Sequence, residues 1–129
     1  MIEIRYTAPD ELDISGTVEE LQAVRREILS LIQSDLDQVS FAADSSIEPR
    51  PYDLALKKLV IVKSQRPTEI SFRNENEIHI EGAPDCLEAF ASYLDFKPEA
   101  GKGVHSHYEY YDGDKWVAPD SIPLVISVK

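Results

Sequence analysis

The sequence has little cysteine and glycine and no long hydrophobic stretch. Its one cysteine, Cys86, excludes a disulfide within the chain and favours a reducing compartment. No apolar run approaches the ~18 residues of a membrane-spanning helix. No basic segment leads into an apolar one at the start, so no signal peptide is expected. With 43% hydrophobic residues and only five glycines, the chain should be a folded, cytoplasmic globule.

Positive charge is also scarce. The chain has 13 Lys and Arg against 24 Asp and Glu, a net charge of −11, of which −5 falls in residues 1–64 and −6 in residues 65–129. Such a surface repels phosphate backbones and anionic lipids, which disfavours nucleic acid and membrane as partners. It attracts basic proteins over about a Debye length. The alternative interpretation is that the acidic charge only maintains solubility.

The chain contains an internal repeat with an offset of 66 residues. Between Glu3 and Ile28, seven of 26 positions are identical in the second copy, where unrelated segments share roughly one or two. A repeat of this kind is the first signal to use when a fold is predicted. We therefore predict a single domain, 1–129, built of two repeats, 1–64 and 65–129.

The pattern within each repeat predicts two strands, one helix and two further strands. Alternating apolar residues give hairpins over 2–15 and 68–81. Apolar residues at helical spacing predict a helix over 18–33, which opens with a capping box at Thr17 and Glu20. A second helix should begin at Pro84 and end before Pro98. Further strands are expected over 38–41, 59–62, 104–111 and 123–129, and the last should match 59–63 at the same offset.

These elements predict an α+β fold, ββαββ-ββαββ, with pseudo-two-fold symmetry. Both helices should cover one face of a mostly antiparallel, twisted sheet of about eight strands, because each hairpin has only one apolar side. The expected core comprises Leu21, Val24, Ile28, Leu87, Phe90 and Leu94 with Ile4, Ile14, Ile70, Ile80, Val60 and Ile126. The other face should be polar and open to solvent. Its expected residues are Glu3, Arg5, Asp13, Ser15, Ser71, Arg73, His79 and Glu81.

The segment from His105 to Asp114 holds the densest set of reactive side chains. On a strand His105, His107 and Glu109 share one face. A one-residue shift in the repeat turns Tyr108 and Tyr110 toward the helices, so the histidines and Glu109 should lie on the polar face near His79. Two imidazoles and a carboxylate are a common zinc or iron ligand set. They would span roughly 13 Å along a strand, too far for one ion without a bend.

The loop that follows offers weaker signals. Trp116, the only tryptophan, either folds over the edge of the core or anchors a partner. Asp112 and Asp114 have the spacing that opens a calcium loop, but its later ligands are absent. Cys86 at a helix start has no histidine near it in sequence, so it does not predict a nucleophile. No phosphate-binding glycine loop is present, and no cofactor is expected.

Two blocks of the sequence resemble a known family. The residues are Leu12-x-Ile14-x-Gly16-x-x-Glu19-Glu20-Leu21 and His105-x-His107-x-Glu109-Tyr110-Tyr111-(x)6-Ala118-Pro119-Asp120-Ser121-x-Pro123-Leu124-Val125. Together they resemble the immunity protein 32 family of bacterial proteins. The resemblance implies a cytoplasmic, non-catalytic binder that neutralises a polymorphic toxin encoded beside it. It implies no catalytic residues.

Three functions are compatible with the sequence. The first is an immunity protein whose toxin partner, expected to be a basic domain, touches His105, His107, Glu109, Asp112, Asp114 and Trp116. This block differs most from its repeat mate, residues 39–53, and asymmetric loops are where a scaffold acquires function. The second is a metal-dependent enzyme using His105, His107 and Glu109. The third is a self-associating scaffold or regulatory domain, a homodimer through the polar sheet face or an edge strand.

Overall fold

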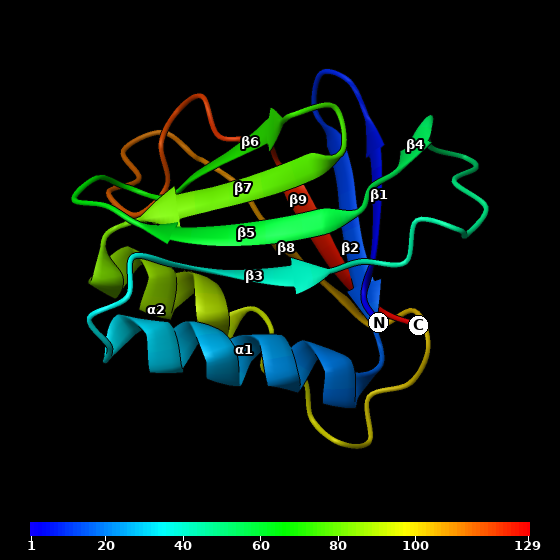
Figure 1. The fold of residues 1–129 in the computed structure, drawn as a ribbon, viewed down its shortest axis with the longest axis horizontal. Helices are drawn as coiled ribbons and strands as arrows, with labels where there is room; N and C mark the ends of the chain where they lie inside the picture. Colours follow the sequence, from blue (N-terminus) through cyan, green and yellow to red (C-terminus); the bar gives the residue numbers. More distant parts are fainter.

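The computed structural model describes all 129 residues and contains nine strands and two helices (Figure 1). It confirms the α+β class. Neither helix is sufficiently long and apolar to cross a membrane. In chain order the elements are β1 (Glu3–Thr7), β2 (Glu11–Gly16), α1 (Val18–Ile32), β3 (Gln38–Ala42), β4 (Leu54–Ala55), β5 (Lys58–Lys63), β6 (Glu69–Arg73), β7 (Glu77–Gly82), α2 (Pro84–Ser92), β8 (His105–Tyr108) and β9 (Leu124–Val128).

The strands form two sheets, so the prediction of one sheet of about eight strands was wrong. One sheet has the order β4-β1-β2-β9-β8 and the other has the order β3-β5-β7-β6. Their strands run in clearly different directions in Figure 1. Both sheets are mixed, with parallel pairs β2–β9 and β5–β7 and otherwise antiparallel neighbours. Alternation shows which side of a strand is buried but not which strand pairs with it, which is why the sequence did not reveal two sheets.

Each sheet takes strands from both halves of the chain. The first hairpin, β1–β2, pairs with β9 from the second half, and the second hairpin, β6–β7, pairs with β5 from the first. The hairpin registers match at the predicted offset of 66, with Ile4 opposite Ile14 and Ile70 opposite Ile80. This agreement supports the internal duplication, which stays a prediction.

The last strand of each half does not match at the predicted offset. Leu124 lies opposite Leu12, whereas Leu59 lies opposite Ile78, the repeat mate of Leu12. The offset of this strand is therefore 124 − 59, or 65. The shifted register keeps Leu59 and Leu124 on the buried side, both 1% exposed. Side-chain burial therefore decides the register rather than residue identity.

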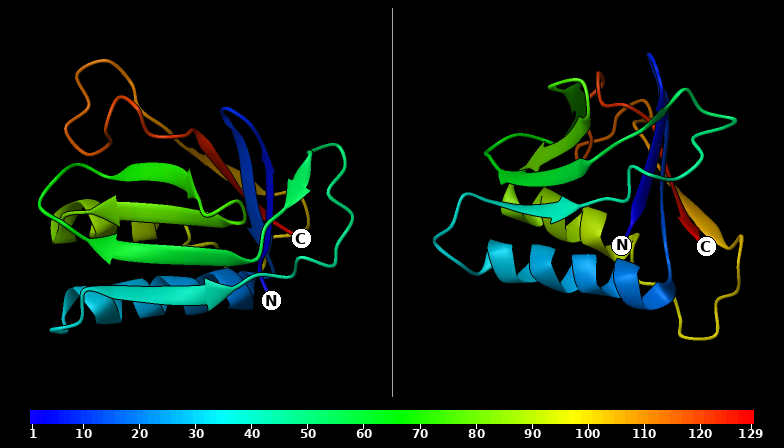
Figure 2. Two further views of the ribbon diagram at one scale, coloured as in Figure 1. Left: turned by 45° about the horizontal axis from the view of Figure 1, so that its top comes forward. Right: turned by 45° about the vertical axis from the view of Figure 1, so that its right-hand side comes forward.

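The two helices pack against each other on the same side of the four-stranded sheet, as predicted (Figures 1 and 2). α1 begins with the predicted capping box: the Glu20 N–H donates to Thr17 Oγ1 at 3.1 Å, and the Thr17 N–H donates to Glu20 Oε1 at 2.9 Å. α2 begins at Pro84 as expected. It ends at Ser92, six residues before Pro98, and Leu94 beyond its end is still buried, at 2% exposed.

The core contains 25 buried residues from both sheets and both helices. Eleven of the twelve predicted core residues belong to it. Val60 is the exception: it is 3% exposed but lies opposite His79 on the outer side of the four-stranded sheet. Gly82 permits the close approach of β7 to the chain before β6, because a Cβ there would lie 2.9 Å from Thr68 Oγ1. The pattern of apolar residues therefore predicted the core better than the sheets.

Candidate functional site

The structure divides the predicted site residues between two surfaces. In β8, His105 and His107 lie opposite Ser127 and Val125 on the outer side of the five-stranded sheet, and both are exposed. Tyr108 faces the other way and is 3% exposed, as the shifted repeat predicted. Asp112, Asp114 and Trp116 follow in the loop after β8, and Glu109 lies between the two groups. We call the surface around His105 and His107 the histidine face. We call the cavity lined by Asp114 and Trp116 the aromatic pocket.

The histidine face is formed by the outer side chains of β1, β2, β9 and β8. Its centre is Asp13, whose Oδ1 accepts a hydrogen bond from the Ser127 hydroxyl at 2.9 Å. Burial raises the pKa of Asp13, and the hydrogen bond from Ser127 opposes this shift. Arg5 lies beside it and pairs with Glu3 at 3.1 Å. This face therefore contains a partly desolvated carboxyl group rather than a fully hydrated row of polar side chains.

The histidine face is less open than predicted, and His79 is not near it. Tyr52, from the loop between β3 and β4, lines a pocket of about 190 Å³ together with His107 and Glu109. The loop is held over the sheet edge by a bond from Arg5 Nε to the Glu48 carbonyl at 3.2 Å. His79 belongs to the other sheet, where its ring lies 2.9 Å from Glu77 Oε1. The predicted proximity of the three histidines was wrong, because they lie on separate sheets.

The predicted metal ligands do not form a cluster. The rings of His105 and His107 are 5.1 Å apart and edge to face, and Glu109 lies beyond the end of β8. No three His, Cys, Asp or Glu side chains in the molecule converge closely enough to hold a metal ion. The geometry therefore gives no support to a metal-dependent enzyme built on these residues.

The aromatic pocket lies between α2 and the loop after β8. Tyr93, Tyr111 and Trp116 line a cavity of about 260 Å³ and remain 40%, 66% and 46% exposed. The buried Tyr108 also lines it, and its ring packs edge to face on Tyr93 with centroids 4.9 Å apart. Burial raises the pKa of Tyr108 to about 12, so this phenol stays neutral at physiological pH. Three partly exposed aromatic side chains therefore surround one cavity.

A short turn and an added backbone pairing position Trp116. The Asp114 N–H donates to the Tyr111 carbonyl at 2.9 Å, and Gly113 takes a positive φ of 85° in this turn, which suits glycine. The Asp114 carboxylate accepts from the Trp116 N–H at 2.8 Å. Thr68 then donates to the Trp116 carbonyl at 2.8 Å, so the loop is fastened to the chain entering β6. The backbone of Trp116 is held, while its ring is left accessible.

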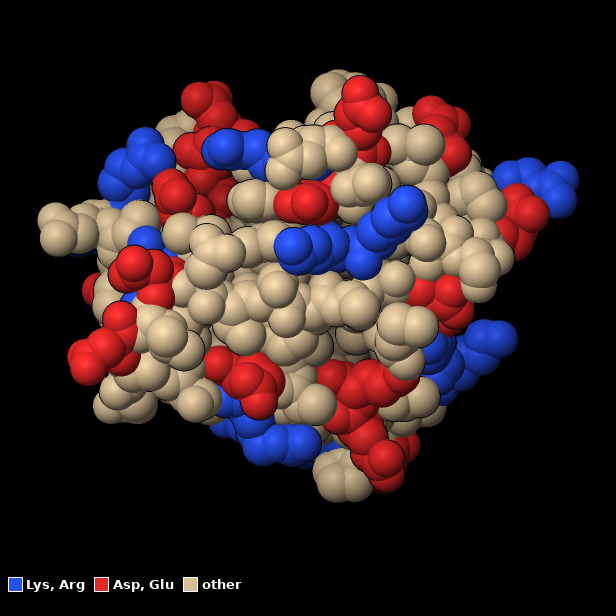
Figure 3. All heavy atoms as spheres, viewed as in Figure 1, with Lys and Arg blue, Asp and Glu red and all other residues tan.

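Carboxylates surround the aromatic pocket, and no cation lines it. Glu109 and Asp114 contribute to its wall. A neighbouring depression, which shares Trp116, adds Asp85, Glu88 and Asp95 from α2 and the turn that follows it, together with Arg25, which lies 4.0 Å from Asp95. Glu109 and Asp114 form no ion pair within 4.0 Å. The aromatic pocket is therefore negative as well as apolar, although charges of both signs are interspersed on the face seen in Figure 3.

The aromatic pocket contains two residues that the sequence did not single out, Tyr93 and Tyr111. Tyr111 lies in the segment already recognised as dense in reactive groups, and its repeat position gave no reason to expect exposure. Tyr93 closes α2 and is brought to the loop only by the tertiary fold. Asp112 is exposed and lines neither pocket. The backbone of Trp116 pairs with Thr68 at the core edge and the residue stays 46% exposed, while its role as an anchor for a partner stays a prediction.

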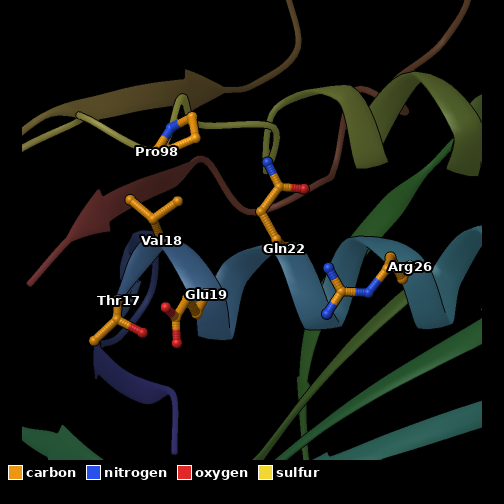
Figure 4. Close-up of a pocket in the computed structure, with 6 residues that line it drawn as sticks. All are labelled: Thr17, Val18, Glu19, Gln22, Arg26 and Pro98. Atoms are coloured by element: carbon orange, nitrogen blue, oxygen red, sulfur yellow. The ribbon is translucent and has the colours of Figure 1, made fainter.

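Two other features lie away from this surface. The largest hollow, about 780 Å³, is polar and open at the start of α1 (Figure 4). Its lining residues are Thr17, Val18, Glu19, Gln22, Arg26 and Pro98. Cys86 is buried, and burial raises the pKa of its thiol, which opposes thiolate formation. Neither feature brings reactive groups together.

Comparison with known proteins identifies the family of the C-terminal part. Residues 77–129 match the family described as immunity protein 32, and these residues contain β7, α2, β8 and β9. The match confirms the resemblance predicted from the block between His105 and Val125. The earlier block, from Leu12 to Leu21, lies outside the matched residues. No curated protein and no solved structure matches this chain.

Proposed function

We propose that this protein is a non-catalytic immunity protein that neutralises a bacterial toxin by binding it. The observation that supports the proposal best is the aromatic pocket, which lies wholly within the residues matched to the family. Exposed Trp and Tyr side chains dominate the binding energy of many protein interfaces, because they bury large areas with few rotatable bonds. A stable scaffold that presents such side chains is suited to masking another protein.

The charge of the molecule favours a basic toxin domain as the partner. The net charge is −11, and the carboxylates of Glu109 and Asp114 border the aromatic rings without a cation beside them. Complementary charge raises the rate of association steeply at low salt. The predicted site residues Asp112 and Asp114 would then mainly raise the rate of association with the toxin. Trp116 would mainly stabilise the complex once it has formed. His105 and His107 would contribute only if the partner extends across Glu109 to the histidine face.

The proposal is tested with the toxin domain encoded beside the gene of this protein. We expect co-expression to rescue growth, and the purified pair to form a stable complex. The variant Trp116→Ala should raise the Kd by about 30-fold or more, as loss of an interface anchor does. Leu36→Ala is the matched control, because Leu36 is 66% exposed and lines none of the pockets described above. Failure of the pair to associate would refute the proposal.

Reversing the charge of Asp112 and Asp114 tests whether these carboxylates raise the rate of association with the toxin. The double variant Asp112→Lys and Asp114→Lys should slow association on the order of tenfold at low salt and less at high salt. The double variant Asp35→Lys and Asp37→Lys makes the same change of charge on the loop after α1 and should have a smaller effect. If the first pair leaves the association rate at low salt unchanged, the toxin binds elsewhere, and the loop from Ala43 to Tyr52 becomes the next surface to test.

A further inference from the structure

We propose that the aromatic pocket receives an arginine side chain of the partner protein. This inference rests on the proposed function, and it names the chemistry of the contact at the centre of that surface. Three features of the aromatic pocket carry it: the aromatic walls, the unpaired carboxylates and the size of the cavity.

The walls present aromatic rings to a single small cavity. Tyr93, Tyr111 and Trp116 come from two separate segments, the end of α2 and the loop after β8, and all three line the same space. The face of an aromatic ring carries negative charge density and attracts a cation, with Trp the strongest and Arg the commonest partner. A neutral apolar group would also fit against these rings, so the rings alone do not choose the occupant.

Two carboxylates in the lining of the aromatic pocket favour a cationic occupant. Glu109 and Asp114 line the same cavity, neither is in an ion pair, and no Lys or Arg lines it. Asp114 uses one carboxylate oxygen, Oδ1, to accept from the Trp116 N–H, and its Oδ2 makes no hydrogen bond within the protein. An apolar occupant would desolvate both carboxylates with no compensation, which is costly. A cationic occupant would pair with them.

The size and shape of the aromatic pocket favour a side chain, and arginine over lysine. Its volume of about 260 Å³ lies below the ~300–1,000 Å³ typical of sites for drug-sized ligands. A guanidinium group is planar, stacks on aromatic rings and donates two parallel hydrogen bonds to a carboxylate, whereas an ammonium group does neither. The combination of aromatic lining residues and two carboxylates therefore matches arginine.

The experiment uses the protein alone and reports from the aromatic pocket directly. Trp116 is the only tryptophan, so its fluorescence senses an occupant without any label. We expect N-acetyl-arginine amide to change this emission saturably. N-acetyl-citrulline amide, which has the same shape but no charge, should not do so, and N-acetyl-lysine amide should bind more weakly than the arginine probe. An equal response to arginine and citrulline, or no saturable response, would overturn the inference.

Variants of the lining residues test whether the arginine probe binds in the aromatic pocket. Tyr111→Ala should weaken the arginine probe by roughly 2- to 30-fold, the range of one cation–π contact, and it removes a side chain that is 66% exposed, so we expect little effect on folding. Glu109→Gln and Asp114→Asn should weaken it as well, while Asp114→Asn keeps an acceptor for the Trp116 N–H. Leu36→Ala should leave it unchanged. Unaltered probe affinity in all three pocket variants would contradict the assignment.

The outcome is separable from that of the proposed function. If the arginine probe binds but the neighbouring toxin domain does not, the aromatic pocket is cation-selective and the immunity role fails. If the toxin domain binds in a way that depends on Trp116 and the arginine probe does not bind, the immunity role stands and the arginine assignment fails.

Discussion

At the scale of single residues, Glu20 connects the start of α1 to both ends of the chain. It closes the capping box of α1 with Thr17, and its carboxylate also pairs with the N-terminal ammonium group and with Lys129, whose Nζ lies 3.3 Å from Glu20 Oε1. Burial tends to raise the pKa of Glu20, but these contacts outweigh it and lower the pKa to about 2 from an ordinary 4.5. The start of α1 and both ends of the chain therefore meet at one carboxylate.

This carboxylate should make stability depend on pH in acid. A pKa lowered in the folded state adds stability that is complete above pH 4.5 and is lost as the pH falls toward 2. Solvent reaches the group and screens its ion pairs, so we expect Glu20→Gln to cost on the order of 1 kcal/mol at pH 7. The cost should shrink toward pH 2 in denaturant titrations. Glu19→Gln, one residue earlier and exposed, is the control. A cost that is the same at pH 7 and pH 2 would exclude an ionic origin.

At the scale of elements, α2 shows how a short helix is held mainly by its buried side. It has no side-chain cap at Ala83 and only nine residues, so its intrinsic stability is low. Leu87 and Phe90, at 0% and 1% exposed, fix it to the core, and Tyr93 and Ala89 on its other side border the aromatic pocket. Packing of α2 and the geometry of the candidate site are therefore connected.

Truncation of this helix at its centre should be costly. We expect Leu87→Ala to lower the free energy of unfolding by about 2–5 kcal/mol, because a fully buried leucine leaves a cavity. Glu88→Ala, in the same turn and exposed, should have little effect. Chemical denaturation followed by circular dichroism measures both. A loss below about 0.5 kcal/mol for Leu87→Ala would mean that this side of α2 does not pack as described.

The elements also show where sequence reasoning succeeds and where it stops. Both hairpins, both helix starts and the orientation of Tyr108 follow from local periodicity, capping and the repeat. The two-residue strand β4, the division into two sheets and the approach of Tyr93 to Trp116 depend on pairings between distant segments. Local patterns carry no information about such pairings, so the predicted site included the loop after β8 but not Tyr93, which the fold brings beside that loop.

At the scale of the whole molecule, the two halves are interleaved rather than placed side by side. Dividing the chain between residues 64 and 65 would split both sheets, one at the β2–β9 pair and the other at the β5–β7 pair. We expect fragments 1–64 and 65–129 to be unfolded alone, because each would expose unpaired strand edges and half of an apolar core. Mixing them should restore the circular dichroism of the intact chain. Cooperative thermal unfolding of either fragment by itself would contradict this expectation and would indicate two separate domains.

The position of β9 has a consequence for how the protein is made. Leu124–Val128 is the last strand along the chain, yet it lies inside the five-stranded sheet between β2 and β8. During synthesis, more than a hundred residues after β2 must therefore be made before β2 can pair with β9. Folds that depend on such distant pairings form slowly. If the proposed immunity function holds, the protein would become protective only after β9 has been made, so a cell would need a standing stock of it before the toxin is met.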